Sequence, residues 1–284
     1  MTFLRPVKTF DWSNLRQRAM SAFVLAPIAI LAVLAPSISW IGSWPFLVVM
    51  AAAIALLAHE WGVMAAPERP AAVALSIAVG LLAAEFVAYL GHYHLAWAVL
   101  FVAILACAAI ARAVGARPAD AAFGVAYLGG PCLALTWVRL GAQDGLAWTI
   151  LLLAVTWAAD IGAFAVGNIV GGPKLWPRFS PNKTWSGFLG GLVVAMAVGA
   201  SVTVAFRSHM RLSLGAAILM GLVGGLATMA GDLVESILKR RFGVKDSGDL
   251  IPGHGGLLDR VDGFMFAILA VAIARLVHLA GWAA

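Results

Sequence analysis

Nine apolar stretches of roughly twenty residues follow one another along the chain, each long enough to cross a bilayer as a helix. They are 20–36, 44–61, 71–90, 95–114, 120–138, 146–167, 187–206, 212–235 and 261–281. Short breaks with turn chemistry separate them, such as Pro67-Glu68-Arg69-Pro70. With 63% hydrophobic and 11% charged residues, the chain has more apolar surface than a soluble domain can bury. The sequence therefore predicts an all-α, polytopic integral membrane protein.

Two of these stretches, 120–138 and 146–167, contain more glycine, proline, threonine and acid than a lipid-facing helix favours. We therefore expect both helices to face the interior of the bundle. The basic leader either lies on the membrane surface as an amphipathic helix or serves only to orient the chain. The expected divisions are a leader over 1–19, a first group of transmembrane helices over 20–145 and a catalytic group over 146–284.

Lysine and arginine are distributed unequally between the two ends of the predicted helices. With nine spans, the side that holds the N-terminus carries fifteen of them, namely Arg5, Lys8, Arg16, Arg18, Arg69, Arg112, Arg117, Lys174, Arg178, Lys183, Lys239, Arg240, Arg241, Lys245 and Arg260. The other side and the last helix carry four, namely Arg139, Arg207, Arg211 and Arg275. An excess of Lys and Arg marks the cytoplasmic side. We expect a cytoplasmic N-terminus, a location in the inner cell membrane and no nucleic-acid partner for the net charge of +6.

The charged residues concentrate in one stretch, from Gly231 to Gly263. Its 33 residues hold six of the thirteen acids and five of the nineteen bases. If the preceding helix continues through Lys239, then Asp232, Glu235/Ser236 and Lys239 lie on one face by the i, i+3/i+4 spacing. Ion pairs in a solvated loop would explain an isolated Lys-Arg-Arg run, but they give no reason for glycines, a histidine and carboxylates at helix starts.

The end of this stretch joins a glycine-rich turn to the last predicted helix. Residues 252–256 read Pro-Gly-His-Gly-Gly, and the first turns of the helix carry Asp259, Arg260 and Asp262. Glycines let a ligand approach backbone N–H groups, and the positive end of a helix favours an anion such as phosphate. Carboxylates from two helices suit Mg²⁺ bridged to substrate phosphates. The stretch therefore predicts a site for a metal ion and phosphate groups.

A second polar segment lies on the same predicted face. Asp160 is inside one helix, and residues 180–187 read Ser-Pro-Asn-Lys-Thr-Trp-Ser-Gly at the start of the next. Hydroxyls, a lysine and free N–H groups at a helix start can bind an anion. An ordinary N-cap explains Ser180 about as well, so Lys183 is the more specific candidate.

Two acids of the first half have alternative explanations. Glu60 ends the second apolar stretch, where we expect a solvated helix end; the alternative is that it reaches the polar site. Glu85 lies inside the third stretch, where an ionisable group is a functional candidate unless it is near the water boundary.

Residues 236–262 resemble the signature of the phosphatidate cytidylyltransferases, also called CDP-diacylglycerol synthases. Asp160 with Ala163-Phe164, and Ser180-Pro181 with Lys183-Thr184-Trp185, resemble two further motifs of that family. The resemblance is strong from Trp157 to the end of the chain, and the first half is similar only as a run of helices.

The resemblance implies a nine-helix enzyme of phospholipid biosynthesis that makes CDP-diacylglycerol and pyrophosphate from CTP and membrane-embedded phosphatidate. It implies Mg²⁺ as cofactor, held by Asp232 and Asp259, with a second cation such as K⁺ in the same site. The other catalytic candidates are Asp160, Lys239, Lys245, His254, Arg260 and Asp262. The substrate-binding candidates are Ser180, Lys183, Thr184, Ser236, Arg240, Asp246, Gly255 and Gly256. His254 either donates to a phosphate oxygen or fixes the loop, and a homodimer is compatible with the sequence.

The chain departs from the family pattern at three positions. Ser186 stands where Glu is usual, Asn168 where Arg is usual, and Asp249 where Asn is frequent. These changes concern the surroundings of the site. Two other function classes fit some of the residues: a transporter that binds an anion at helix ends, and a CTP-dependent lipid kinase. A transporter would move its substrate without consuming nucleotide, and a kinase would release CDP in place of pyrophosphate.

Overall fold

The computed structural model describes residues 27, 30–38, 41–141, 144–177, 180–250 and 255–281. After the 3₁₀ turn η1 (Ala35–Ser37), the helices are α2 (Trp44–Ala65), α3 (Pro70–Tyr89), α4 (Tyr93–Ala113), α5 (Pro118–Leu140), α6 (Gly145–Val170), α7 (Trp185–Ala205), α8 (Arg207–Met210), α9 (Leu214–Arg241) and α10 (Leu258–Leu279). In these ranges, eight helices are long and apolar enough to cross a membrane.

These eight helices coincide, within a few residues, with the last eight apolar stretches of the sequence. The prediction of an all-α polytopic membrane protein is therefore confirmed. The first predicted stretch, 20–36, lies mostly outside the described residues, and the leader over 1–19 lies entirely outside them. The expected division at residue 145 stays a prediction.

Proline and short polar side chains set several helix starts. Pro70 and Pro118 occupy the first turns of α3 and α5, where a missing N–H costs nothing. Thr184 caps α7, because its hydroxyl accepts from the Gly187 N–H at 3.1 Å. Ser213 caps α9 in the same way, accepting from the Ala216 N–H at 3.2 Å.

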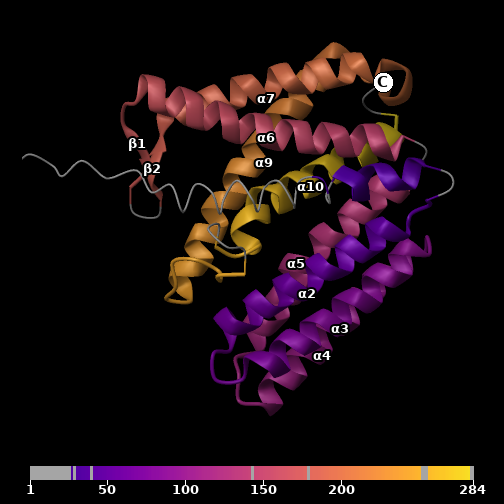
Figure 1. Cartoon of the computed structure of the whole chain (residues 1–284), viewed down its shortest axis with the longest axis vertical. Helices are drawn as coiled ribbons and strands as arrows, with labels where there is room; N and C mark the ends of the chain where they lie inside the picture. The colour runs from indigo at the N-terminus through magenta and orange to yellow at the C-terminus, as the bar shows by residue number, and fades with distance from the viewer. Residues whose placement is uncertain are drawn as a thin grey trace, which may run out of the picture.

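Two apolar cores hold the helices together. One lies among α2, α3, α4 and α5, and the other lies among α5, α6, α7, α9 and α10. Figure 1 shows α6 and α7 side by side along one edge, with α9 and α10 between them and the α2–α4 group. Both α5 and α10 contribute side chains to each core, so they join the two groups.

The expectation that residues 120–138 and 146–167 both face the interior is half right. In α5, 67% of the most apolar 18-residue segment is buried. The corresponding share is 28% to 44% in the other seven helices long enough to cross a membrane. In α6 the corresponding share is 39%, and Ile161, Phe164 and Ile169 are among its exposed side chains. Asp160 and Gly167 of α6 line a groove near one end of the helix, and they do not require the rest of α6 to be buried.

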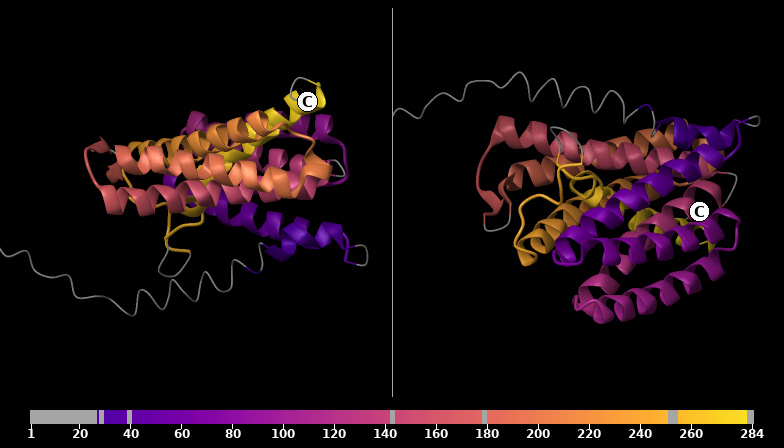
Figure 2. Two further views of the ribbon diagram at one scale, coloured as in Figure 1. Left: turned by 90° about the horizontal axis from the view of Figure 1, so that it is seen from above. Right: turned by 60° about the horizontal axis from the view of Figure 1, so that its bottom comes forward.

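A hairpin interrupts the helices between α6 and α7. Strand β1 (Lys174–Trp176) pairs antiparallel with β2 (Ser180–Thr184), within the second polar segment, for which the sequence predicts no strand. The pairing places Lys174 opposite Thr184 and Trp176 opposite Ser180. The hairpin and the C-terminal end of α9 lie at the same end of the molecule in Figure 1 and in the right view of Figure 2.

Two arginines of the opposite end serve as internal ties. Arg139 is 5% exposed and donates to the Val33 carbonyl at 2.7 Å and the Ser37 hydroxyl at 2.8 Å. Arg275 is 1% exposed and donates to the last carbonyls of α5, at Trp137 and Val138. Because a guanidinium is expensive to bury without partners, these backbone acceptors explain why both arginines are tolerated there.

Candidate active site

Two glycines let α9 and α10 cross closely beside the acids. A Cβ on Gly231 would lie 2.5 Å from the Asp262 carbonyl oxygen, and one on Gly263 would lie 2.8 Å from Asp232 Oδ1. Any larger residue at either position would therefore separate the helices. The crossing places Asp232 of α9 next to Asp262 of α10.

At this crossing lies a pocket of about 250 Å³, which we call the acidic pocket. All nine residues that line it are polar or charged: Lys183, Asp232, Glu235, Ser236, Lys239, Asp246, Asp259, Arg260 and Asp262. Eight of these are candidates from the sequence, and Glu235 is the addition. The structure thus brings together residues from α9, α10, the hairpin and the loop after α9.

Two lysines pair with the carboxylates of the acidic pocket. Lys239 Nζ lies 2.5 Å from Asp259 Oδ1 and 2.9 Å from Glu235 Oε2. Lys183 Nζ, from the hairpin, lies 2.6 Å from Asp232 Oδ2. Lys239 is more enclosed than Lys183, with 14% of its side chain exposed against 33%. Lys183 is therefore the easier of the two to displace.

Asp259 also organises the glycine turn before α10. Its Oδ2 accepts from the Ser247 N–H at 3.1 Å, the Ser247 hydroxyl at 3.0 Å and the Gly256 N–H at 3.0 Å. Gly255 has φ +83°, and a Cβ there would lie 3.0 Å from the same oxygen. The sequence predicted these glycines as ligand contacts; in the described structure they surround a carboxylate of the protein itself.

The chemistry of the acidic pocket fits a divalent cation. Its lining holds five carboxylates against three cationic side chains, so negative charge is in excess. Glu235 is 2% exposed, and its Oε1 has no hydrogen-bond partner among the described residues, although an unsatisfied buried acceptor is costly. No three His, Cys, Asp or Glu residues form a ready metal cage in the part of the chain that the structure describes. Mg²⁺ does not need one, because it uses one or two carboxylates with water and substrate phosphates.

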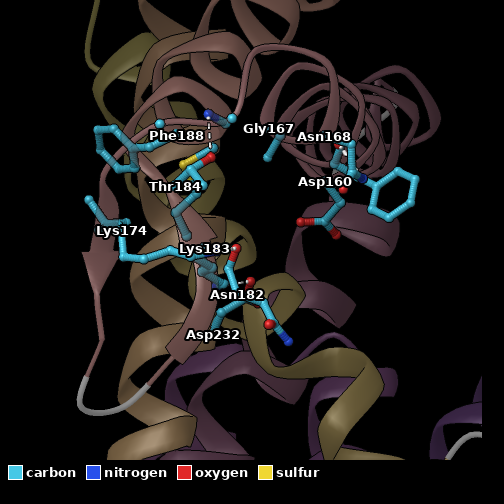
Figure 3. Close-up of a pocket in the computed structure, with 16 residues that line it drawn as sticks. Asp160, Gly167, Asn168, Lys174, Asn182, Lys183, Thr184, Phe188 and Asp232 are labelled. Carbon is cyan, nitrogen blue, oxygen red and sulfur yellow. Dashed lines mark hydrogen bonds and ion pairs between the residues drawn. The ribbon is translucent and has the colours of Figure 1, made fainter. Parts of the chain in front are cut away.

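A larger groove of about 610 Å³ adjoins the acidic pocket. It is bounded by the second half of α6, the hairpin, the start of α7 and part of α9 (Figure 3). Lys183 and Asp232 line both the groove and the acidic pocket, so the two spaces meet at this ion pair. Asp160 and Thr184, both candidates from the sequence, also line the groove, while Lys174 and Asn182 are additions.

Besides Gly255 and Gly256 of the glycine turn, four further candidate residues are not placed in either lining. Ser180 pairs with Trp176 in the hairpin, and Lys245 is exposed on the loop after α9. Arg240 is exposed and donates to the Val244 carbonyl at 3.4 Å, which places it at the C-terminal end of α9. His254 lies outside the described residues.

The three departures from the family pattern have separate local contacts. Asn168 lines the groove and donates to the Phe164 carbonyl at 2.9 Å. The Ser186 hydroxyl donates to the Gly171 carbonyl and so ties the start of α7 to the end of α6. Asp249 is exposed on the loop after α9. None of the three lines the acidic pocket.

Two acids of the first half differ in where the structure places them. The expectation of a solvated end for Glu60 is wrong: the side chain is 1% exposed and accepts from Ser247, Leu257 and Leu258. Glu85 is also 1% exposed, accepts from the Thr136 hydroxyl and lies near the far end of α3. Glu60 therefore joins the surroundings of the acidic pocket, and Glu85 does not.

The chain is similar to known proteins over most of its length. A model of the cytidylyltransferase family matches residues 16–278. A phosphatidate cytidylyltransferase of Brucella suis is 36% identical over 269 residues, which cover 95% of this chain and 94% of the relative. A phosphatidate cytidylyltransferase of Staphylococcus aureus is 42% identical over 154 residues, covering 52% of this chain and 56% of that protein. Since the family model matches nearly the whole chain, the chain belongs to the cytidylyltransferase family.

Proposed function

We propose that this protein transfers the cytidylyl group of CTP to phosphatidate in phospholipid biosynthesis. A phosphate oxygen of phosphatidate forms a bond to the α-phosphorus of CTP, the bond from that phosphorus to the β-phosphate bridging oxygen breaks, and pyrophosphate leaves. The single observation that carries the proposal is an acidic pocket that opens into a groove beside an exposed apolar helix face. Such a pair of spaces suits one soluble nucleotide and one membrane lipid.

We assign the groove to phosphatidate and the acidic pocket to the triphosphate of CTP. On α6, Phe164 lines the groove, while Ile161 and Ile169 expose 67% and 83% of their surface close by. Acyl chains can pack on this face while the headgroup enters the groove, where Lys174 and Lys183 supply positive charge. The acidic pocket has no apolar side chain in its lining, which suits a hydrated polyphosphate with its cation.

The residues that would hold Mg²⁺ are Asp232 and Asp259, with Glu235 and Asp262 beside them. When bound, the cation would neutralise charge on attacking and leaving phosphate oxygens. In the described structure the Asp232 side chain pairs with Lys183, whereas Asp259 also orders the glycine turn, so Asp232 has fewer structural contacts to give up when it binds a cation. We propose that a second cation such as K⁺ would bind in the same pocket.

The remaining work of the protein is positioning and charge neutralisation. The nucleophile is already an anion near neutral pH, so no strong general base is required. Lys183, at the junction of the two spaces, can contact both the lipid phosphate and the α-phosphate. Lys239 and Arg260 line the acidic pocket and would bind the leaving pyrophosphate.

We further propose that the site faces the cytoplasm in an inner cell membrane. The count of fifteen Lys and Arg against four supports this orientation. The difference in exposed Lys and Arg between the two sides is larger still, because Arg139 and Arg275, on the side with four, are buried and hydrogen-bonded inside the protein. Soluble CTP would then reach the acidic pocket directly.

The decisive experiment uses detergent-purified protein with phosphatidate, Mg²⁺ and CTP labelled separately at the α- and γ-phosphates. The proposal expects α-label in a lipid product and γ-label in pyrophosphate. Lipid labelled from the γ-phosphate, with CDP released, would identify a lipid kinase. Absence of labelled lipid under varied salts and metals, for protein that is folded, would contradict both.

A further inference from the structure

Glu60 connects the first half of the chain to the start of α10. It lies near the end of α2, yet Oε1 accepts from the Leu257 N–H at 2.6 Å and Oε2 accepts from the Leu258 N–H at 2.8 Å. The first N–H groups of a helix have no partner within the helix, so these bonds satisfy donors that would otherwise be unpaired. The carboxylate charge is also favourable at the positive end of α10.

A shared hydroxyl extends this contact to the acidic pocket. The Ser247 Oγ lies 3.1 Å from Glu60 Oε2 and 3.0 Å from Asp259 Oδ2, and Ser247 is 3% exposed. A hydroxyl has one proton and donates to one carboxylate at a time. Ser247 therefore couples the position of Glu60 to that of Asp259.

The glycine turn fits closely around the Glu60 carboxylate. A Cβ on Gly256 would lie 2.8 Å from both Glu60 oxygens and would overlap the Ser247 hydroxyl. On Gly248, a Cβ would lie 3.3 Å from Glu60 Cγ. Both sides of the loop after α9 are thus packed against one side chain of α2.

We infer that Glu60 is a positioning residue that sets the geometry of residues 246–250 and 255–262 for the CTP half of the reaction. This inference rests on the proposed function for its substrates. Among the described residues, 246–250 and 255–262 supply Asp246, Asp259, Arg260 and Asp262 to the acidic pocket and nothing to the lining of the groove. Loss of Glu60 contacts should therefore change the use of CTP and Mg²⁺ while leaving the use of phosphatidate unchanged.

The test is Glu60→Gln in the full-length, detergent-purified protein. Glutamine keeps the shape but replaces one acceptor oxygen by an NH₂ donor that faces N–H groups, so at least one buried bond is lost. We expect KM for CTP and the Mg²⁺ concentration for half-maximal rate to rise about tenfold. KM for phosphatidate should stay within about twofold of the wild-type value. Glu68→Gln, an exposed acid at the same end of the bundle, is the matched control.

Hydrogen exchange supplies a readout that does not depend on turnover. In Glu60→Gln the amides of Leu257 and Leu258 should exchange about tenfold faster, because their acceptors are weakened. If Glu60→Gln does not fold, Ser247→Ala is the second variant. It keeps the bonds from Leu257 and Leu258 to Glu60, so KM for CTP and amide exchange should rise less than in Glu60→Gln. Unchanged exchange with an unchanged KM for CTP overturns the inference, and so does an equal rise in KM for both substrates. Wild-type protein that makes no CDP-lipid would refute the proposed function. The exchange data would still show whether Glu60 holds the start of α10 in place.

Discussion

Lys183 and Asp232 form a 2.6 Å ion pair at the junction between the acidic pocket and the groove. The lysine comes from the hairpin and the aspartate from α9, and neither side chain is fully enclosed, with 33% and 25% of their surfaces exposed. A cation that binds Asp232 must compete with this lysine. A displaced Lys183 is then free to pair with a phosphate group, so cation binding and phosphate binding are coupled through one exchange of partners.

Lys183→Gln should lower both the Mg²⁺ requirement of the enzyme and its maximal rate. The competing charge at Asp232 is gone, so the Mg²⁺ concentration for half-maximal rate should fall. The rate at saturating Mg²⁺ should drop about tenfold or more, because a phosphate group loses its cationic partner. Mg²⁺ titration of CDP-lipid formation measures both. Lys174→Gln is the control, because Lys174 lines the groove but not the acidic pocket. An unchanged Mg²⁺ requirement in Lys183→Gln would contradict competition between the lysine and the cation.

Asp232→Asn and Asp259→Asn should each reduce CDP-lipid formation by about a hundredfold or more. Their effects on the fold should differ. In the described structure the Asp232 side chain pairs with Lys183, whereas the Asp259 side chain holds Ser247, Gly256 and Lys239. Hydrogen exchange in residues 246–258 should therefore stay near wild type in Asp232→Asn and increase in Asp259→Asn. Near-normal turnover in either variant, with folded protein, would refute the metal assignment.

Lys239 and Arg240 are neighbours in the sequence with different expected roles. Lys239→Gln leaves Glu235 and Asp259 without their shared cation, which should destabilise the protein by about 3 kcal/mol or more and abolish turnover. Arg240→Gln removes an exposed side chain that contacts the Val244 carbonyl, so turnover should stay within about threefold and stability within about 0.5 kcal/mol. Thermal unfolding in detergent and initial rates compare the two. A large loss of activity in Arg240→Gln would restore its predicted role in substrate binding.

The crossing of α9 and α10 predicts a strong effect from a single methyl group. Gly231→Ala would place a Cβ 2.5 Å from the Asp262 carbonyl, so the helices must separate at an expected cost of about 1–3 kcal/mol. Activity should fall at least tenfold because Asp232 and Asp262 move apart. Gly215→Ala in the same helix is the control, since its Cβ would meet nothing within 4 Å. Equal activity in the two variants would show that the spacing of these acids is not critical.

The sequence predicts the transmembrane part of this fold well because the signal is local. A run of apolar residues is sufficient to identify each helix, and α9 and α10 fall within a few residues of the expected 212–235 and 261–281. The acids and bases of residues 231–263 are also contiguous, so their gathering at one site follows from one helix end and one helix start. Family resemblance adds Asp160 and Lys183 from the preceding helix and segment.

What the sequence does not reveal depends on long-range contacts. Glu60 is 197 residues from Leu257, and a lone acid followed by tryptophan at a helix end looks like an ordinary water boundary. Glu235 is hidden for another reason: its position next to Ser236 on the helix is evident, but its burial depends on α10. The sequence does not predict the exposed apolar face of α6, because Asp160 and two glycines favour an interior position although they lie in only one part of the helix.

The contact between Glu60 and α10 also bears on the order in which the protein is made. A ribosome completes α2 long before it completes α10, and Glu60 precedes its partner Leu258 by 198 residues. Throughout that interval the carboxylate has to stay hydrated or protonated, because an unpaired charge is not tolerated in hydrocarbon. The N–H groups of Leu257 and Leu258 that pair with this carboxylate are made only with the start of α10. The same segment brings Asp259, Arg260 and Asp262, so the partners of Glu60 and three residues of the acidic pocket enter the chain together.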